Sequence, residues 1–409
     1  MSNFKRYDKY KDSGIEWIGE IPEGWEVTKL KYICSITMGQ SPKSEEYSRE
    51  EGGLPFLQGN AEFTELYPHP KIYCDTANKR SKVNDILLSV RAPVGKMNIS
   101  NRVYGIGRGL CAITAQKVHL KYLWYSMNVS LEELSINSQG STFEAVTVAD
   151  VNNLSAIVPP ADEQISIANF LDQKTAEIDD LIVDKEKLIE LLQEKRQAVI
   201  TEAVTKGLNP NVKMNDSGIE WIGEIPEGWE VKKLKYVTKF AYGDSLPVDE
   251  REAGDIDVFG SNGKIGTHAV SNTSSPVVIV GRKGSYGKVT YVEKECFAID
   301  TTYYIDNRCT TSNIKWLYYL LTILELDKNS QDTGVPGLSR EYAYNKYVFL
   351  PPIDKQISIA NFLDRKTAEI DSLVSEIQEQ IQKLREYRQS LIFEAVTGKI
   401  DVRDYAAIS

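Results

Sequence analysis

The sequence PPADEQISIANFLDQKTAEID at Pro159–Asp179 returns as PPIDKQISIANFLDRKTAEID at Pro351–Asp371, 192 positions further along the chain. A second repeat accompanies it, because DSGIEWIGEIPEGWEV stands at Asp12–Val27 and again, unchanged, at Asp216–Val231. Identity of this length does not arise by chance, and a period of about 200 residues is far longer than that of a solenoid repeat. The sequence therefore predicts a tandem duplication of a unit of domain size.

The longer repeat predicts a long helix in each copy. Asp162 is suited to cap a helix after Pro159 and Pro160, and neither Gly nor Pro follows until Gly207. Apolar residues recur with a period of seven along both copies, which is typical of a coiled-coil seam. The predicted seam residues are Leu171, Ile178, Leu181, Leu188, Leu192 and Val199 in the first helix and Leu363, Ile370, Leu373, Ile377, Leu384 and Leu391 in the second.

The two helices are expected to pair with one another. At a rise of 1.5 Å per residue, about 40 helical residues extend roughly 60 Å, too long to pack within one small domain. A duplicated chain can close up with pseudo-two-fold symmetry when its two helices run antiparallel. The alternative, in which each helix packs only on its own domain, is disfavoured because each apolar stripe continues over five heptads.

The segments between the repeats are themselves distant copies. Lys121–Tyr125 (KYLWY) matches Lys315–Tyr319 (KWLYY), and Ile86–Arg91 resembles Val277–Arg282. Apolar strands that run into Gly-Lys turns, together with one or two helices, predict an α+β fold with a twisted sheet. The shorter repeat, with four Gly or Pro among its tryptophans and isoleucines, predicts an extended segment anchored to a core.

We therefore predict two pseudo-two-fold related α+β domains separated by a long antiparallel two-helix coiled coil. The predicted boundaries are 1–27 for the lead-in, 28–158 for the first variable domain, 159–206 for the first helix, 207–231 for the linker and second lead-in, 232–350 for the second variable domain, 351–398 for the second helix and 399–409 for a tail.

Composition excludes several classes of protein. The 409 residues suffice for two or three domains. The five cysteines include no CxxC pair and the three histidines are far apart, which argues against a disulfide framework or a zinc site. No run of about 18 apolar residues occurs and the polar start lacks a signal peptide, so we expect no membrane association and a cytoplasmic location.

The net charge of −10 is unevenly distributed. Residues 28–158 hold 14 Lys+Arg and 12 Asp+Glu, and residues 232–350 hold 15 and 14, so the acidity lies in the repeated segments, the linker and the tail. This distribution permits nucleic-acid binding by the variable domains, and it predicts that the chain alone binds DNA weakly.

No catalytic constellation is recognisable. The glycine-rich turns at Gly260 and Gly281 do not fit a nucleotide P-loop, because Gly263-Lys264 is followed by Ile265 where a hydroxyl is required. The tetrapeptide of amino-methyltransferases is also missing, and its nearest counterparts are VPPA at 158–161 and LPPI at 350–353. We expect no metal and no cofactor bound by this chain.

Binding residues are better represented, because Gln, Asn, Ser, Arg and Tyr in glycine turns are suited to contact base edges and phosphates. For any single one of them, an ordinary solvated turn residue is the commoner explanation. The candidate DNA-binding residues are Gln40, Ser41, Lys43, Gln58, Asn60, Arg91, Lys96 and Arg108 in the first variable domain and Ser261, Asn262, Lys264, Arg282, Lys283, Ser285, Tyr286, Lys288, Ser339 and Arg340 in the second.

The twice-used DSGIEWIGEIPEGWEV, the helix start PPxxxQISIANFLDxKTAEID and the alternation of repeated and divergent segments resemble the DNA-specificity subunits of type I restriction-modification systems over essentially the whole chain. The resemblance implies that each divergent segment is a target-recognition domain that reads one half of a split, asymmetric DNA sequence.

The resemblance also implies partners. The repeated helices would form a spacer and bind two modification subunits, which methylate adenine, and restriction subunits would join through them. S-adenosylmethionine, ATP and magnesium are then expected in those partner subunits, and this chain is expected to be non-catalytic. The recognition domains vary too much in this family for residue roles to transfer.

Two other classes remain open on the sequence. A coiled-coil scaffold that joins two proteins without DNA explains the helices and the acidity equally well, but not the recurring basic and amide turns. A solitary nuclease or methyltransferase is disfavoured by the missing motifs.

Overall fold

The computed structural model describes residues 4–131, 133, 145–219, 223–328 and 337–405, and the chain divides into two compact units. Unit 1 consists of residues 1–184 and 380–409, and unit 2 consists of residues 185–379. Each unit contains one lead-in, one variable domain and portions of two long helices, α4 (Ala161–Lys206) and α7 (Ile353–Val396). No helix in the described part of the chain is long and apolar enough to cross a membrane.

A buried glutamine explains how each long helix begins. The Gln164 side-chain amide donates to the Pro159 carbonyl at 2.8 Å and accepts from the His119 backbone N–H at 2.8 Å. Gln356 repeats both bonds with Pro351 and Asn313, at 2.9 and 2.8 Å. The glutamine of QISIANFLD therefore joins the start of the helix to the variable domain of the same unit, and this geometry accounts for its presence in both repeats.

Within each unit, α4 and α7 run antiparallel. In unit 1, Asp179 of α4 pairs with Arg388 of α7 at 2.9 Å. In unit 2, Arg196 of α4 pairs with Asp371 of α7, also at 2.9 Å, and the end of α4 at Lys206 lines a cavity with the start of α7. The two ion pairs occupy the same positions of the repeat, with the helices exchanged.

Part of the predicted seam is corrected. Leu171, Ile178, Leu363, Ile370, Ile377 and Leu391 are buried, and Leu192, Val199 and Leu384 are half-buried. Leu181, Leu188 and Leu373 are instead exposed by 49%, 44% and 47%. The buried stripe passes through residues four positions after each heptad residue, including Thr175, Ile182, Thr367 and Ile381. On a helix, the residues three and four positions after a heptad residue both lie beside it. The sequence analysis chose the leucines three positions on, whereas the structure buries the residues four positions on.

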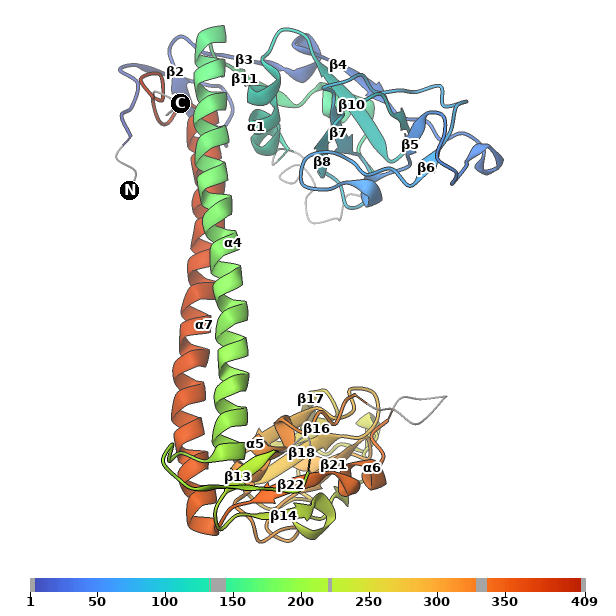
Figure 1. The fold of residues 1–409 in the computed structure, drawn as a ribbon. Helices are drawn as coiled ribbons and strands as arrows, with labels where there is room; N and C mark the ends of the chain where they lie inside the picture. Colours follow the sequence, from blue (N-terminus) through green and yellow to red (C-terminus); the bar gives the residue numbers. More distant parts are fainter. Residues whose placement is uncertain (1–3, 132, 134–144, 220–222, 329–336, 406–409) are drawn as a thin grey trace. The chain divides into compact units, whose positions relative to one another are not determined.

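Each variable domain contains two sheets and short helices (Figure 1). In unit 1 the main sheet has the antiparallel order β4-β10-β7-β8, and a smaller sheet has the order β6-β5-β9. The bounds are β4 (Cys34–Met38), β5 (Pro55–Leu57), β6 (Ile72–Tyr73), β7 (Ile86–Ser89), β8 (Met97–Ile99), β9 (Gly105–Ile106), β10 (Leu110–Ala115), α1 (Leu120–Ser130) and α3 (Val148–Asn152). Apolar side chains of β7, β10 and α1 form the core of the domain, including Ile86, Leu88, Ile113 and Leu123.

Unit 2 repeats this plan with the sheet orders β15-β21-β18-β19 and β17-β16-β20. The bounds are β15 (Ala241–Tyr242), β16 (Ile256–Gly260), β17 (Gly263–His268), β18 (Val277–Gly281), β19 (Val289–Val292), β20 (Phe297–Ala298), β21 (Thr302–Ile305), α5 (Ile314–Thr322) and α6 (Arg340–Asn345). The predicted α+β class is therefore observed in both domains.

The lead-ins form short hairpins, and a strand pair closes each domain. The hairpins pair β1 (Tyr10–Asp12) with β2 (Glu20–Pro22) and β12 (Met214–Asp216) with β13 (Glu224–Pro226); the closing pairs join β3 (Glu26–Lys29) to β11 (Ser155–Val158) and β14 (Glu230–Lys233) to β22 (Tyr347–Leu350). The buried Trp25 indole donates to the Glu163 carboxylate at 3.0 Å, so the first lead-in is anchored on the start of α4, as its composition indicates.

Strand register corrects one sequence alignment. Ser89 pairs with Leu110 in unit 1, and Gly281 pairs with Thr302 in unit 2, each 192 positions later. Arg91 therefore corresponds to Lys283 and not to Arg282. The offset of one residue could not be recognised from the sequence, because basic residues and a glycine turn follow both strands.

The KYLWY and KWLYY segments dock each variable domain onto its long helix. Tyr125 of α1 donates to the Asp172 carboxylate at 2.8 Å, and Lys121 binds the other carboxylate oxygen. In unit 2, Tyr319 donates to Asp364 at 2.9 Å, and Lys315 binds the same group at 2.7 Å. Burial raises the pKa of both tyrosines well above the usual range, so each hydroxyl keeps the proton that it donates.

We expect Tyr125→Phe to lower the local stability of unit 1 by about 1–2 kcal/mol, because the Asp172 carboxylate loses a partly buried hydrogen bond. Tyr319→Phe should have the same effect on unit 2. Hydrogen-exchange mass spectrometry of the full chain measures the two units separately. Tyr387→Phe, at an exposed position of α7, is the control. Unchanged protection in both docking variants would contradict this account of docking.

Candidate nucleic-acid interface

Three loops of unit 1 converge on the Gln58 side chain. Ser41 Oγ accepts hydrogen bonds from Gln58 Nε2 at 2.7 Å and from the Arg108 backbone N–H at 3.1 Å. The single proton of the Tyr47 hydroxyl is shared between the Pro42 carbonyl at 3.1 Å and Gln58 Oε1 at 3.3 Å. The Gln40 backbone N–H donates to the Ile106 carbonyl at 2.9 Å. Gln40, Ser41, Gln58 and Arg108 are thus brought together, and we refer to them as the Gln58 cluster.

A glycine is required where two of these loops meet. A Cβ atom on Gly39 would lie 2.1 Å from the Gly107 carbonyl oxygen, a distance that no side chain tolerates. Gly243 has the same relation to the Ile299 carbonyl oxygen in unit 2, again at 2.1 Å. The close approach of the two loops is therefore part of the duplicated framework.

The other predicted residues of unit 1 lie outside this cluster. Arg91 and Lys96 are exposed on the β7–β8 turn, next to Val90, whose N–H donates to the Gly109 carbonyl at 2.9 Å. That bond holds the turn alongside the loop that carries Arg108. Lys43 is exposed before the 3₁₀ turn Ser44–Glu46, and Asn60 begins the 3₁₀ turn Asn60–Glu62.

In unit 2, four predicted residues line one cavity of about 580 Å³, namely Arg282, Lys283, Ser339 and Arg340. Tyr242, which the sequence analysis missed, lines it as well. The guanidinium carbons of Arg340 and Arg282 lie 4.9 and 5.5 Å from the Tyr242 ring centroid, within cation–π range. We call Tyr242, Arg282, Lys283 and Arg340 the Tyr242 pocket.

Hydrogen bonds orient parts of this pocket. The Arg282 guanidinium donates through Nε and Nη2 to the Asp300 carbonyl, at 2.9 and 2.6 Å. Ser339 accepts from the Tyr342 N–H at 3.4 Å and caps α6, so its hydroxyl has a structural role. Burial raises the pKa of Tyr303 to about 12, and the neighbouring Tyr242 adds to this effect, so the Tyr303 phenol stays neutral at physiological pH.

The remaining candidates of unit 2 lie elsewhere. Lys264 pairs with Asp257 at 2.7 Å, and Lys288 donates to the Asn262 carbonyl at 2.8 Å. Ser285 and Tyr286 line a separate cavity of about 340 Å³ together with Lys288. Ser261 stands in the β16–β17 turn next to Asn262. The predicted residues of unit 2 therefore form at least two groups and not one.

The duplicated frame carries different side chains at equivalent places. Met38 pairs with Cys111 and Tyr242 pairs with Tyr303, so Met38 is the counterpart of Tyr242. The register also makes Val90 and Val148 the counterparts of Arg282 and Arg340. Conversely, Leu57 pairs with Ile106 and Phe259 with Ala298, which makes Gly260 the counterpart of Gln58. Each unit presents polar side chains where the other has apolar residues or glycine.

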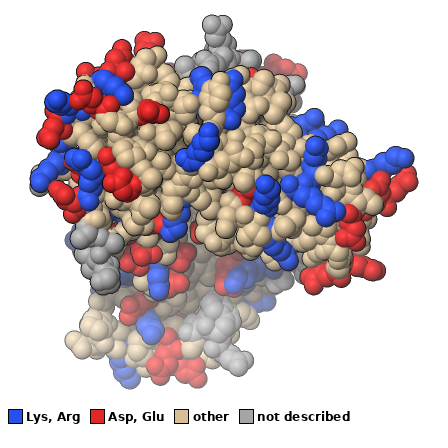
Figure 2. Space-filling model, turned by 90° about the horizontal axis from the view of Figure 1, so that it is seen from above, with Lys and Arg blue, Asp and Glu red and all other residues tan. Residues whose placement is uncertain are grey.

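Charge alone does not define these surfaces. On the face drawn in Figure 2, Lys and Arg side chains lie among Asp, Glu and uncharged side chains. Among the described residues, no group of three His, Cys, Asp or Glu side chains is placed to hold a metal ion. The chemistry on offer is hydrogen bonding by amide and guanidinium groups held in fixed orientations.

Comparisons with known sequences agree on one family. Residues 22–191 and 226–383 each match the type I restriction modification DNA specificity domain. The chain is 40% identical over 193 residues to the putative type I restriction enzyme MjaX specificity subunit of Methanocaldococcus jannaschii, which covers 46% of this chain and 44% of that protein. It is 25% identical over 452 residues to the MjaIX specificity subunit of the same organism, covering 99% of each.

Solved structures show the same fold. A chain from a study of complex assembly and conformational transition of the type I R-M system superposes with a TM-score of 0.74 at 17% identity, covering 92% of this chain and 98% of that one. The HsdS subunit from Thermoanaerobacter tengcongensis superposes with a TM-score of 0.53 at 18% identity, covering 93% and 98%.

We expect Gly39→Ala to cost about 1–3 kcal/mol of stability, because its methyl group must displace the Gly107 carbonyl and disturb the Gln58 cluster. Thermal unfolding of the full chain measures the loss. Gly59→Ala is the matched control, since no atom lies within 4 Å of its added Cβ. Equal stability of the two variants would show that the loops are not held as closely as described.

Proposed function

The chain belongs to the type I restriction-modification DNA specificity family, and we propose that its two variable domains each read one half of a split DNA target. As a specificity subunit it is a non-catalytic component of such a system. The observation that carries the proposal is the contrast between the Gln58 cluster and the Tyr242 pocket. Two domains with one frame and different polar surfaces are suited to read two different sequences.

The Gln58 amide has the chemistry of an adenine reader. One of its N–H groups is bound to Ser41 and one side of its oxygen to Tyr47, which fixes the plane of the amide. A carboxamide carries two N–H groups and two lone pairs, so one donor and one acceptor are left to present. That pair matches N7 and N6 of adenine in the major groove.

The Tyr242 pocket favours guanine or phosphate instead. A guanidinium group binds O6 and N7 of guanine through two parallel hydrogen bonds, and it also binds phosphate oxygens. Stacking over Tyr242 restricts Arg340, and the Asp300 carbonyl restricts Arg282. Restricted side chains lose less entropy when they bind, so the pocket is preorganised for a DNA contact.

The helices are proposed to set the spacing and to bind two modification subunits, through which restriction subunits join. The equivalent ion pairs of Asp179 with Arg388 and of Asp371 with Arg196 support two equivalent binding surfaces. Exposed apolar side chains on the helices, Leu181, Val183, Leu188, Leu191 and Leu373, support contact with partners. Adenine methylation with S-adenosylmethionine, and cleavage with ATP and magnesium, would occur in the partner subunits.

Exchange of residues 28–158 for the first variable domain of a relative should change one half of the methylated sequence and leave the other half unchanged. Each domain makes equivalent contacts to its own helix, so the exchanged domain should dock in the same way. Mapping of methylated adenines in cells that carry the hybrid chain measures the outcome. A change in both halves would refute independent reading.

Arg340→Ala and Arg282→Ala should each weaken target binding by the assembled complex by about 1–3 kcal/mol, because each removes a positioned guanidinium. Lys328→Ala, which removes an exposed cation of the same unit, is the control for lost charge. Titration of fluorescent target duplexes gives the affinities. Losses equal to that of the control would mean that the Tyr242 pocket contacts no base.

A further inference from the structure

A duplicated phenylalanine has different surroundings in the two units. In unit 1, Phe170 near the start of α4 is fully buried, and two rings meet it edge-on, that of Phe4 at 5.3 Å and that of Tyr405 at 4.8 Å. These rings come from two chain segments, residues 4–10 and 399–405. The segments contact each other, because the Asp401 N–H donates to the Lys5 carbonyl at 2.8 Å.

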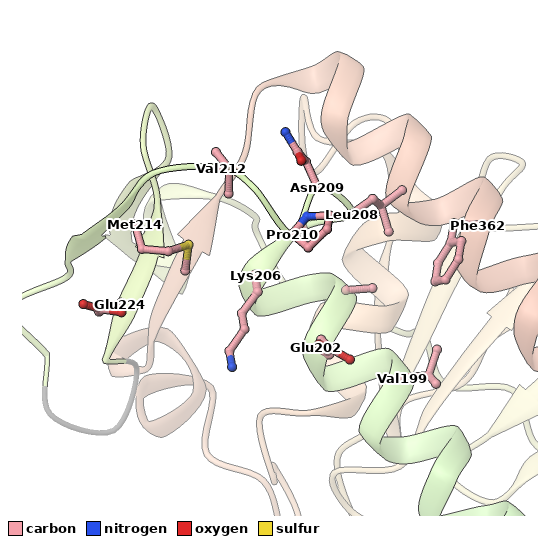
Figure 3. A pocket seen from close by; sticks show the side chains of 12 residues that line it. Val199, Glu202, Lys206, Leu208, Asn209, Pro210, Val212, Met214, Glu224 and Phe362 are labelled. Carbon is pink, nitrogen blue, oxygen red and sulfur yellow. The ribbon is translucent and has the colours of Figure 1, made fainter.

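Phe362 occupies the same position of the repeat in unit 2, but it is only half-buried. It lines an open cavity of about 710 Å³, which lies within the range of about 300–1,000 Å³ typical of binding pockets. Figure 3 shows Phe362 of α7 and Val199 of α4 pointing toward one another across this space. We call this cavity, with Leu208, Glu202 and Glu224 on its rim, the Phe362 groove.

The groove is open because unit 2 has one covering segment where unit 1 has two. The stretch Leu208–Met214 leads from α4 to β12 and aligns with Phe4–Tyr10 of the first copy. It places Leu208 where unit 1 has Phe4, and it leaves Leu208 43% exposed. The same stretch also follows α4 as residues 399–405 follow α7, so one segment of unit 2 stands where unit 1 has two, and it contains no aromatic residue.

We propose that the Phe362 groove binds one extended segment of a partner protein, which inserts an aromatic side chain against Phe362 and places a cationic group near Glu202 and Glu224. In unit 1 the chain's own C-terminal segment makes contacts of this kind. There the counterparts of the two carboxylates are Glu394 and Glu20, and the Lys399 ammonium donates to the Glu20 carbonyl oxygen. In unit 2 the charged residues that line the groove are Glu202, Glu224 and Lys206, so negative charge is in excess there.

The chain therefore has one binding site for such a segment, although its sequence is duplicated. The equivalent place in unit 1 is filled by the chain's own residues, so the partner segment binds once per chain. The aromatic ring of the partner segment should meet Phe362 edge-on, as Tyr405 meets Phe170. The partner segment should lie along Leu208–Met214.

A labelled peptide with the sequence of residues 399–405, KIDVRDY, is the probe, because this segment covers the equivalent phenylalanine in unit 1. Fluorescence anisotropy with the full chain should show saturable binding at one peptide per chain. Phe362→Ala, and a peptide with alanine in place of its tyrosine, should each weaken binding at least tenfold. Leu208→Glu changes an exposed residue of the rim and should do the same without affecting folding.

Tyr387→Ala, which removes an exposed ring elsewhere on α7, should leave peptide binding unchanged. Binding that is absent, or equal in the chain and in Leu208→Glu, would overturn the proposal. A photocrosslinker at position 208 in the assembled complex should then capture a partner segment that contains an aromatic residue. Crosslinks only within the chain, or dimers of the chain that Leu208→Glu dissolves, would refute a partner protein as the occupant.

Discussion

The hydroxyl of Tyr125 and the ammonium of Lys121 meet the two oxygens of the Asp172 carboxylate, and Tyr319 and Lys315 meet Asp364 in the same way. This contact, with the buried Gln164 and Gln356 beside it, joins each variable domain to the first turns of a long helix. Both partners in it are duplicated, whereas the side chains of the loops at the far end of each variable domain have diverged. A fixed contact of this kind lets the loop surfaces change without altering how each domain is held.

The shared strand frame fixes the positions at which the two units carry different side chains. Glycines 39 and 243 allow the same close approach of loops in the two units, so the loops beyond them begin from equivalent positions. On that frame one unit presents the Gln58 amide, oriented by Ser41 and Tyr47, and the other presents arginines stacked on Tyr242. Under the proposed function, the duplication supplies symmetric attachment and asymmetric recognition from one chain, which is the combination that a split, asymmetric DNA target requires.

Much of this architecture could be predicted from the sequence, because repetition marks the helices and the lead-ins and because heptads survive in both copies. Finer predictions failed where neighbouring residues are equally apolar or where the contacting residues are far apart in the sequence. Leu181 and Leu188 are as apolar as the buried Ile182, so the pattern did not show which side of the stripe faces the partner helix. Tyr242 was missed because the strand that it ends has only two residues, and the Gln58 cluster depends on a hydrogen bond between residues 67 positions apart.

The central claim is that one duplicated frame presents two different recognition surfaces to DNA. Genome-wide mapping of methylated adenines, in cells with the chain and in cells without it, tests this claim most directly. The account predicts that removal of the chain abolishes methylation at one sequence made of two unlike halves separated by a fixed, unread spacer. Methylation that persists without the chain, or that is lost from a single palindromic sequence, would contradict it.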